Sequence, residues 1–186
     1  MNFRSLLELD ARLSDQLRVA EKPGFLRSFA AFLAHSGDSW FWAAAIVTLW
    51  FFSNSKWKQW AVVEFFGMLG LAGVVLAIKF LVRRERPQGE WGGIYRNTDP
   101  HSFPSGHAAR AFLIAVVGTA LAPPWLAAAL WVWAPLVSLA RVAMGVHYLS
   151  DIIAGGILGS IVGLIGLQIY PPMIHWLIGL IGFPLW

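Results

Sequence analysis

The stretch from Ser105 to Trp186 contains only three charged side chains, Arg110, Arg141 and Asp151. A bilayer core is crossed by about 20 apolar helical residues, and charged groups are costly inside it. Of the chain's 186 residues, 58% are hydrophobic and 13% are charged, whereas soluble domains average roughly 45–50% apolar and about 25% charged residues. The composition therefore excludes a soluble or disordered chain and predicts one membrane-embedded domain, residues 1–186.

The apolar segments predict an all-α integral membrane bundle of five or six transmembrane helices. A polar turn at 53–58 separates the first two segments, and Pro123-Pro124 separates two later ones. Strands are excluded because the apolar runs are too long and lack alternation of polar and apolar residues. The predicted spans are 39–53, 58–82, 105–122, 125–145 and 150–169.

The two ends of the chain fit a membrane span less well. Residues 3–20 mix leucines with acidic and basic side chains, which predicts an amphipathic helix on the membrane surface. The apolar run 25–33 is too short to cross alone. The tail 171–186 contains three prolines, so we expect an interfacial or half-crossing segment there. The sequence leaves open whether 25–36 and 171–186 span the membrane.

The charge balance and the missing thiols limit the partners and the chemistry. A net charge of +4 in so apolar a chain suits anionic lipid better than nucleic acid. The absence of Cys excludes disulfides, thiolate metal sites and cysteine nucleophiles. We therefore expect the bilayer and a membrane lipid as partners, with no nucleic acid; the oligomeric state is not readable from the sequence.

Ionisable residues gather in three clusters at the ends of the predicted spans. Residues 79–87 end the second span, residues 102–107 begin the third, and residues 141–151 join the fourth to the fifth. The first two clusters flank one loop, and the third comes two crossings later. All three are therefore expected on the same face of the membrane.

Three cations in these clusters, Lys79, Arg86 and Arg141, favour binding of a dense anion such as phosphate. Arginine supplies planar, bidentate recognition and lysine a point charge. The residues Ser105 and Gly106 directly precede an apolar helix, whose N-terminal N–H groups and dipole also attract an anion.

Two histidines and an aspartate supply the reactive groups. His147 and Asp151 are four residues apart, so on a helical turn they face the same way. An aspartate that holds one imidazole nitrogen leaves the other free to attack, and His107 can protonate a leaving oxygen. This set fits phosphoryl transfer through a phosphohistidine without metal or cofactor. A zinc site built from the same residues is disfavoured by the three cations.

These residues resemble the motifs of the type 2 phosphatidic acid phosphatase superfamily. Its first motif, Lys, six residues, Arg-Pro, is matched by Lys79 and Arg86-Pro87, and its second, Pro-Ser-Gly-His, by Pro104–His107. Its third, Ser-Arg, five residues, His, three residues, Asp, is matched from Arg141 to Asp151, with Ala140 at the Ser position. The resemblance covers residues 79–151, and we expect Ala140 to tune the site rather than inactivate it.

The resemblance implies a role for each matching residue. His147 is then the nucleophile, Asp151 its orienting partner and His107 the general acid. The phosphoryl oxygens are then bound by Lys79, Arg86 and Arg141 with help from Ser105 and Gly106. The sequence around the first two motifs, including Arg110, most resembles that of the polyisoprenoid diphosphate phosphatases within this superfamily. Arg110 itself is expected either to contact the headgroup or to pair with Glu64.

The sequence thus predicts a metal-independent lipid phosphatase in the cell membrane that hydrolyses a polyprenyl diphosphate or a related lipid phosphate. The alternatives are a glycerophospholipid phosphatase acting on phosphatidic acid or phosphatidylglycerol phosphate, and a lipid-binding transporter without catalysis. Lys56 and Lys58, in the loop opposite the site, favour an active site on the outer face. Arg83, Arg84 and Arg96 are expected as interfacial anchors or lipid headgroup contacts rather than catalysts, and His35, His101 and His175 as non-catalytic.

Overall fold

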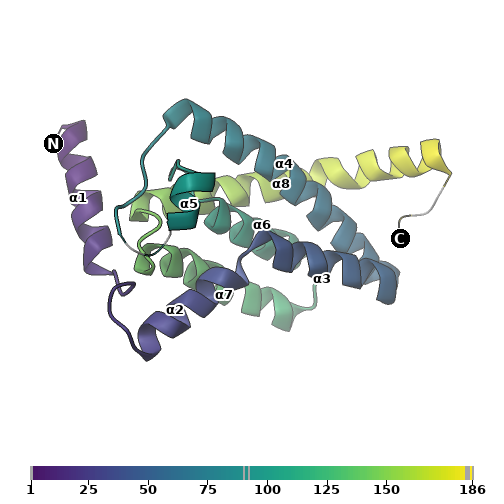
Figure 1. Cartoon of the computed structure of the whole chain (residues 1–186). Coiled ribbons are helices and arrows are strands. Elements are labelled where there is room, and N and C mark those ends of the chain that lie inside the picture. The colour runs from purple at the N-terminus through teal and green to yellow at the C-terminus, as the bar shows by residue number, and fades with distance from the viewer. Residues whose placement is uncertain (1, 90, 92, 183–184, 186) are drawn as a thin grey trace.

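The computed structural model describes residues 2–89, 91, 93–182 and 185, and over these residues it is helical, without an extended strand (Figure 1). The predicted all-α class is confirmed. The helices are α1 (Phe3–Gln16), α2 (Phe25–Ser36), α3 (Ser39–Phe52), α4 (Ser55–Val82), α5 (Gly93–Thr98), α6 (Gly106–Leu121), α7 (Pro124–Ala143) and α8 (Leu149–Ile181).

Five apolar helices occupy the five predicted spans. By length and composition, α4, α7 and α8 can each cross a membrane. The helices α3 and α6 are apolar but shorter. With 16 residues and a rise of 1.5 Å per residue, α6 is about 24 Å long, less than the roughly 30 Å hydrocarbon core. It lies inside the bundle, with its residues from Leu113 to Gly118 buried.

Local sequence sets where these helices begin. The Asn54 side chain accepts a hydrogen bond from the Trp57 backbone N–H at 3.3 Å, so α4 begins at Ser55. Ser105 caps α6 in the same way, with its Oγ 3.4 Å from the Ala108 nitrogen. Pro124 stands at the first position of α7, where its missing N–H costs nothing.

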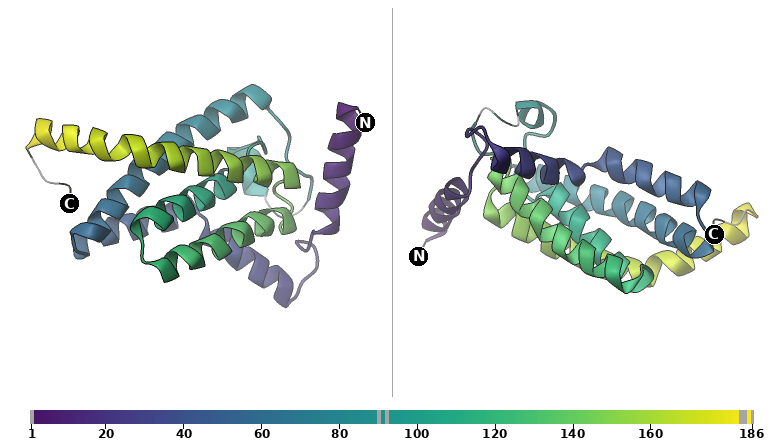
Figure 2. Two further views of the ribbon diagram at one scale, coloured as in Figure 1. Left: turned by 180° about the vertical axis from the view of Figure 1, so that it is seen from behind. Right: turned by 90° about the horizontal axis from the view of Figure 1, so that it is seen from below.

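The core of the bundle is built around α6. This helix lies between α8 and α7 (Figure 2) and also packs against α4. Leu113 and Ile114 on α6 are fully buried. Glycines on α8 allow the closest approach: a methyl group on Gly155 would lie 2.5 Å from the Ser105 carbonyl oxygen, and one on Gly159 would meet the backbone of Ala109. The close packing of α6 on α8 fixes the second motif against the third.

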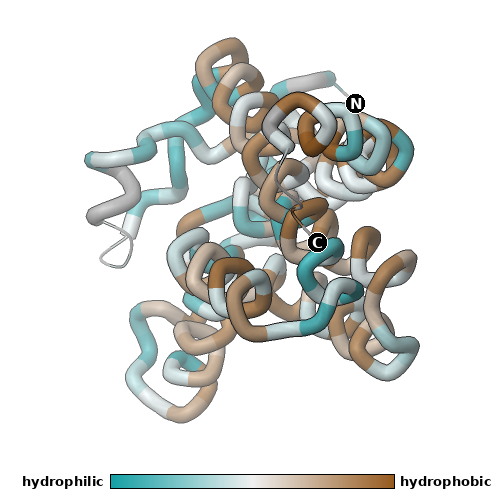
Figure 3. Tube along the Cα trace, turned by 90° about the vertical axis from the view of Figure 1, so that its right-hand side faces the viewer, coloured by the Kyte–Doolittle hydropathy of each residue, from teal (hydrophilic) through white to brown (hydrophobic). Residues whose placement is uncertain are grey.

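The outer surface of the bundle carries many large apolar side chains. Figure 3 shows hydrophobic residues all around the helices rather than only between them. Phe52, Leu81 and Trp125 are 87%, 82% and 70% exposed. A soluble monomer rarely exposes contiguous apolar surface on this scale, so these side chains are positioned to contact lipid.

One predicted boundary is wrong. The fifth span was expected to end at 169, with a separate tail from 171, but α8 continues through Pro171 and Pro172 to Ile181. The two prolines do remove two backbone donors, yet the turn after them is anchored. Ile174 is fully buried in the core, and Ile178 packs against the same cluster. Prolines are tolerated in membrane helices where neighbouring helices hold the segment, and here burial outweighs the lost hydrogen bonds.

The ends of the chain frame the site. Helix α1 lies beside the start of α8, at the same end of the bundle as α5 (Figure 1), and contacts α7 and α8. Helix α2 has 12 residues, too few to cross alone, and packs along α7. The short helix α5 was not predicted; it lies in the loop that joins α4 to α6.

Candidate active site

The three motifs meet at one end of the bundle. Lys79 lies in the last turn of α4 and Arg141 in the last turn of α7, while His107 lies in the first turn of α6 and Asp151 in the first turn of α8. A backbone hydrogen bond of 3.0 Å from the Ser105 N–H to the Asp151 carbonyl joins the second motif to the third. The folding of α4, α6, α7 and α8 therefore assembles the site.

A cavity of about 290 Å³ brings most of the predicted site residues together. Its polar wall includes the predicted residues Lys79, Arg86, Gly106, His107, Arg110, Arg141 and His147, and also Asp99. Its apolar lining comes from α4, through Met68, Leu71, Ala72, Val75 and Leu76. Ser105 does not line this cavity because its hydroxyl caps α6, and Asp151 lies behind His147. The cavity therefore joins a cationic end to an apolar wall.

The cations of this cavity are deeply buried and are paired with a carboxylate that the sequence analysis did not single out. Lys79 and Arg86 are each 4% exposed, and Arg141 is fully buried. Asp99 Oδ2 lies 2.5 Å from Lys79 Nζ and 2.8 Å from Arg86 Nη2. Burial alone would raise the pKa of Asp99, but the two cations lower it by a larger amount, so the net pKa lies below its usual value. Asp99 is therefore ionised and bridges two of the predicted phosphate-binding residues.

His147 is held in a single orientation. Its Nε2 lies 3.1 Å from Arg86 Nη1, and its Nδ1 lies 3.5 Å from Asp151 Oδ2. Because a guanidinium can only donate, Nε2 accepts and the imidazole proton is on Nδ1, facing Asp151. Burial lowers the pKa of His147 well below its usual value, and Arg86 and Arg141 lower it further. A neutral imidazole with its Nε2 lone pair directed toward the cations is the form that can attack phosphorus.

Asp151 is fixed by more than its histidine. Its Oδ2 accepts from the Tyr148 backbone N–H at 2.8 Å, which also caps α8. Its Oδ1 accepts from Arg84 Nη1 at 2.8 Å. The expectation that Arg84 is an interfacial anchor is therefore wrong. Its side chain is only 17% exposed, and its Nη2 also donates to Asp10 Oδ2 on α1 at 2.8 Å.

The remaining basic residues of the loop behave differently. Arg83 ends α4 in the left-handed conformation, with φ of 52°, and its Nε donates to the Phe80 carbonyl at 2.9 Å. It is exposed, as an interfacial side chain would be. The side chain of Arg96, which was also expected at the interface, lies outside the described residues.

His107 and Arg110 both contact the turn between α2 and α3. His107 Nε2 lies 2.8 Å from Asp38 Oδ1, and Arg110 Nη1 donates to the Gly37 carbonyl. Of the two roles considered for Arg110, pairing with Glu64 is not observed among the described residues, and Glu64 is fully buried elsewhere on α4. Arg110 does line the cavity, so contact with a headgroup remains a prediction.

Ala140, at the position where the family has serine, is directed toward an apolar cluster. It is 4% exposed and packs with Ala20, Ala30, Ala34 and Met144 of the α1–α2 connection, α2 and the turn after α7. It does not line the cavity. The alanine therefore fits its surroundings and removes no group from the cavity wall.

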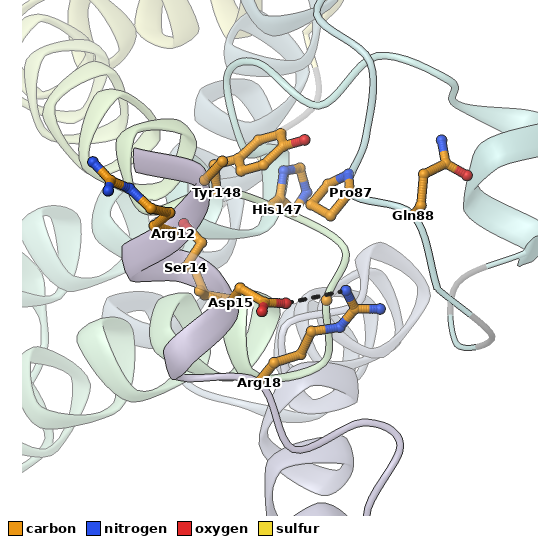
Figure 4. A pocket seen from close by; sticks show the side chains of 11 residues that line it. Arg12, Ser14, Asp15, Arg18, Pro87, Gln88, His147 and Tyr148 are labelled. Atoms are coloured by element: carbon orange, nitrogen blue, oxygen red, sulfur yellow. Dashed lines mark ion pairs between the residues drawn. The ribbon is translucent and has the colours of Figure 1, made fainter. Parts of the chain in front are cut away.

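A second cavity of about 380 Å³ reaches His147 from the other side (Figure 4). It lies between α1 and the 145–148 turn, with Arg12, Asp15 and Arg18 from the first part of the chain on one side and Tyr148 on the other. The ion pair between Asp15 and Arg18 measures 3.6 Å. His147 is only 1% exposed although it lines both cavities, so it forms part of the wall between them.

The residues that the sequence analysis missed are Asp38, Asp99, Arg84 and Asp10. None of them stands at a motif spacing, and each reaches the site through a fold-dependent contact with another element. For two of them the sequence does carry a signal. Asp38 is an acidic residue directly before a predicted span, and Asp99 is an acidic residue in the loop between the first two motifs.

A family model described as the PAP2 superfamily matches residues 60–174, more than half of the chain. The chain belongs to the PAP2 superfamily. Decaprenylphosphoryl-5-phosphoribose phosphatase of Mycolicibacterium smegmatis is 34% identical over 75% of this chain and 76% of that protein. Undecaprenyl-diphosphatase of Sulfolobus acidocaldarius is 30% identical over 77% of this chain and 70% of that protein.

A third relative is longer. Lipid A 1-phosphatase of Porphyromonas gingivalis is 30% identical over 61% of this chain, which spans 24% of that protein's length. Among solved structures, LpxE of Aquifex aeolicus superposes with a TM-score of 0.70 at 26% identity, over 86% of this chain and 95% of that one. A transmembrane PAP2-type phosphatidylglycerolphosphate phosphatase of Bacillus subtilis superposes with a TM-score of 0.75 at 23% identity, over 90% and 87%, a likeness of fold. The chain is a multi-pass membrane protein and a PAP2-type lipid phosphatase.

Proposed function

We propose that this PAP2 protein hydrolyses a polyprenyl diphosphate through a phosphohistidine intermediate. The observation that carries the proposal is the cavity in which Lys79, Arg86 and Arg141 surround His147 at one end and α4 supplies an apolar wall. A phosphorylated lipid needs both: cations for the phosphoryl oxygens and a dry surface for the first carbons of its chain.

In the first chemical step, the substrate phosphoryl group displaces the Asp99 carboxylate from Lys79 and Arg86. Arg86 then donates to a phosphoryl oxygen instead of to His147. The freed Nε2 of His147 attacks phosphorus, the bond from phosphorus to the leaving oxygen breaks, and His107 gives that oxygen a proton. The cations stabilise the charge that develops on the phosphoryl oxygens.

The second step regenerates the enzyme. Water attacks the phosphohistidine and gives a proton to His107, the bond between phosphorus and His147 breaks, and inorganic phosphate leaves. Asp151 Oδ2 faces His147 Nδ1 at 3.5 Å in the resting state, and its negative charge stabilises the ring while Nε2 carries the phosphoryl group. Gly106 lines the cavity at the start of α6, and its N–H supplies a further donor for the anion.

Relatives support a polyprenyl substrate over a glycerophospholipid. Relatives that match this chain over more than two thirds of both lengths are named as decaprenylphosphoryl-5-phosphoribose phosphatases and as an undecaprenyl-diphosphatase. The first of these names favours another candidate, a phosphate monoester on a polyprenyl-linked sugar. The glycerophospholipid alternative rests on a likeness of fold alone.

A phosphate-release panel with the purified protein tests the substrate. It contains undecaprenyl diphosphate, decaprenylphosphoryl-5-phosphoribose, phosphatidic acid and phosphatidylglycerol phosphate, each in matched mixed micelles. The proposal expects the highest kcat/KM for the diphosphate. Preference for the phosphoribose lipid selects the second candidate, and preference for a glycerophospholipid overturns both.

Replacement of His147 tests the chemistry. His147→Ala is expected to abolish phosphate release, and wild-type protein quenched in alkali during turnover should carry acid-labile, alkali-stable phosphate, as expected of a phosphoramidate. Phosphate release that persists in His147→Ala would exclude the covalent route. Transport of lipid by a variant that releases no phosphate would favour the transporter alternative.

We also propose that the site opens on the outer face of the membrane. The support is Lys56 and Lys58, which lie at the start of α4, the opposite end of this helix from Lys79. Basic residues also lie at the site end, Arg84 and Arg86 among them, so the assignment rests on the two lysines alone. Because the chain has no Cys, Ser55→Cys can be labelled in intact cells. Protection from an impermeant maleimide is expected, and labelling would reverse the orientation.

A further inference from the structure

A carboxylate from outside the three motifs reaches His107. Asp38 lies between α2 and α3, with Oδ1 2.8 Å from His107 Nε2 and Oδ2 2.9 Å from His35 Nδ1. The side chains of Asp38 and His107 are 15% and 16% exposed, whereas that of His35 is 53% exposed. The carboxylate therefore lies between an enclosed imidazole on the cavity wall and a solvent-facing one.

The turn that carries Asp38 is fixed against the helices of the site. Trp42 Nε1 donates to the Ser36 carbonyl at 3.0 Å, and Trp133 Nε1 of α7 donates to the Ser36 hydroxyl at 2.9 Å. A methyl group on Gly37 would lie 2.7 Å from Val137 Cγ1 and 3.4 Å from His107 Cδ2. The turn thus packs directly on α7 and on the edge of the His107 ring.

Asp38 is ionised in this setting. Burial alone would raise its pKa, but the hydrogen bonds to His107 and His35 lower it by a larger amount, so the net pKa lies well below its usual value. An ionised carboxylate can only accept hydrogen bonds, so the Nε2 of His107 is the donor. The proton that His107 gives to a leaving oxygen is then the one on Nδ1.

We propose that Asp38 is a positioning residue for His107, and that His35 holds Asp38 from the solvent side. The proposal rests on the proposed role of His107 as general acid. When the leaving oxygen takes the Nδ1 proton, Asp38 keeps the proton on Nε2, so a single neutral tautomer results. That tautomer presents an unprotonated Nδ1, which accepts the proton of water in the second step.

The charges around His107 make this anion necessary. Three other groups that line the cavity act on His107: Arg110 of α6, Arg141 of α7 and His147 in the turn after α7. Two of these are permanent cations that repel a protonated imidazole. Asp38, supplied by the α2–α3 turn, opposes part of this repulsion and so favours the acid form that donates to the leaving group.

The dependence on the leaving group tests the proposal. Asp38→Asn is compared with wild type, His107→Ala and Trp42→Phe on two phosphate monoesters. A long-chain alkyl phosphate has a poor leaving group that needs a proton, and p-nitrophenyl phosphate has a good one that needs little help. Trp42→Phe is the matched control because it removes a hydrogen bond from the same turn and leaves Asp38 in place. Thermal melting verifies that each variant is folded.

Asp38→Asn is expected to lower kcat for the alkyl phosphate by ~10- to 100-fold, as when a carboxylate that orients a metal-bound imidazole is removed. Its kcat for p-nitrophenyl phosphate and its KM for both should change far less. The alkaline limb of the kcat profile for the alkyl ester should move to lower pH, since the protonated imidazole loses its anion. His35→Ala is expected to give a smaller loss with the same selectivity, and Trp42→Phe equal losses on both esters.

Two outcomes overturn this inference and a third separates it from the proposed function. Equal losses of Asp38→Asn on both esters would assign Asp38 a structural role only, as would an unmoved pH profile. If Asp38→Asn does not fold, Asp38→Glu replaces it in the test, because this variant keeps the charge but moves the carboxylate. A ratio of kcat for the alkyl ester to kcat for p-nitrophenyl phosphate that equals the wild-type ratio would then count against positioning. If His107→Ala itself lacks selectivity for the alkyl ester, the general acid role fails, and the function must be reassigned first.

Discussion

The Asp99 carboxylate lies 2.5 Å from Lys79 Nζ, in the cradle where the phosphoryl oxygens of a substrate are proposed to bind. The same oxygen lies 2.8 Å from Arg86 Nη2, and the Asp99 carbonyl accepts from Arg86 Nε at 2.7 Å. Because Lys79 and Arg86 are almost fully buried, the carboxylate neutralises charge that would otherwise be exposed to an apolar interior. The resting site therefore holds an internal anion that substrate must displace.

Asp99→Asn is predicted to strengthen binding of inorganic phosphate and vanadate. A charge-assisted hydrogen bond is worth roughly 1.5–3 kcal/mol, and Asp99 is 42% exposed, so we expect the lower end of this range and about a tenfold lower inhibition constant. Competitive inhibition by vanadate measures it. Asp15→Asn, at an exposed carboxylate on α1, is the control and should leave the constant unchanged. A weaker inhibition in Asp99→Asn would show that Asp99 shapes the cradle rather than competing for it.

The connection from Arg84 to Asp151 predicts that α1 supports the catalytic end of α8. Arg84 joins Asp151 to Asp10, and the Asp10 Oδ1 accepts from the Ser150 backbone N–H at 3.0 Å. Removal of one partner from a buried ion pair costs about 3–5 kcal/mol. Arg84→Gln should lower the free energy of unfolding by an amount that approaches this range, and it should also lower kcat. Arg83→Gln, at the exposed neighbour, should change neither the stability nor kcat.

A double-mutant cycle measures this connection. Arg84→Gln and Asp10→Asn are combined, and unfolding is followed thermally in detergent. A coupling energy of about 1–3 kcal/mol is expected for residues that share a network. Additive effects within about 0.5 kcal/mol would mean that Arg84 acts on Asp151 without help from α1.

The parts of this structure that could be predicted are those encoded locally. The spans at 39–53 and 105–122 follow from their predominantly apolar sequence, and the meeting of Lys79 with Arg141 follows from counting crossings. The contacts of Asp38, Asp99 and Arg84 depend on how the α2–α3 turn and the α4–α6 loop fold back, which no spacing in the sequence specifies. The prolines at 171–172 misled for a related reason. Their local effect is to end a helix, and only the burial of Ile174 against the bundle outweighs it.

The buried, neutral His147 predicts a loss of stability on acidification. Its pKa in the folded protein lies well below the ordinary value of 6.5, so the unfolded chain binds a proton that the folded chain does not. The stability contribution is fully present above pH 6.5 and is lost as pH falls below it, by at most about 1.4 kcal/mol per pH unit. Melting of wild type should therefore decline more steeply from pH 7.5 to 5.5 than melting of His147→Asn. Parallel curves would mean that His147 is protonated in the fold.

Phosphate release is predicted to need no divalent metal. Lys79, Arg86 and Arg141 already supply the positive charge that a metal ion would bring to the phosphoryl group. Dialysis against chelator should leave kcat unchanged, and added Mg²⁺ should not raise it. Loss of activity that returns with one particular metal would replace the proposed cation cradle with a metal-assisted mechanism.

Gly155 predicts a connection between helix packing and the site. A methyl group there would lie 2.5 Å from the Ser105 carbonyl oxygen, at the junction of the second and third motifs, whereas one on Gly73 of α4 would meet nothing within 4 Å. Gly155→Ala should therefore cost about 1–3 kcal/mol, the usual range for overpacking, and should lower kcat by displacing His107 and Asp151 together. Gly73→Ala should be neutral or stabilising by up to about 1 kcal/mol, since alanine favours a helix. If Gly155→Ala lowered the melting temperature but left kcat unchanged, the contact between α6 and α8 would hold the fold without setting the distance between the two motifs.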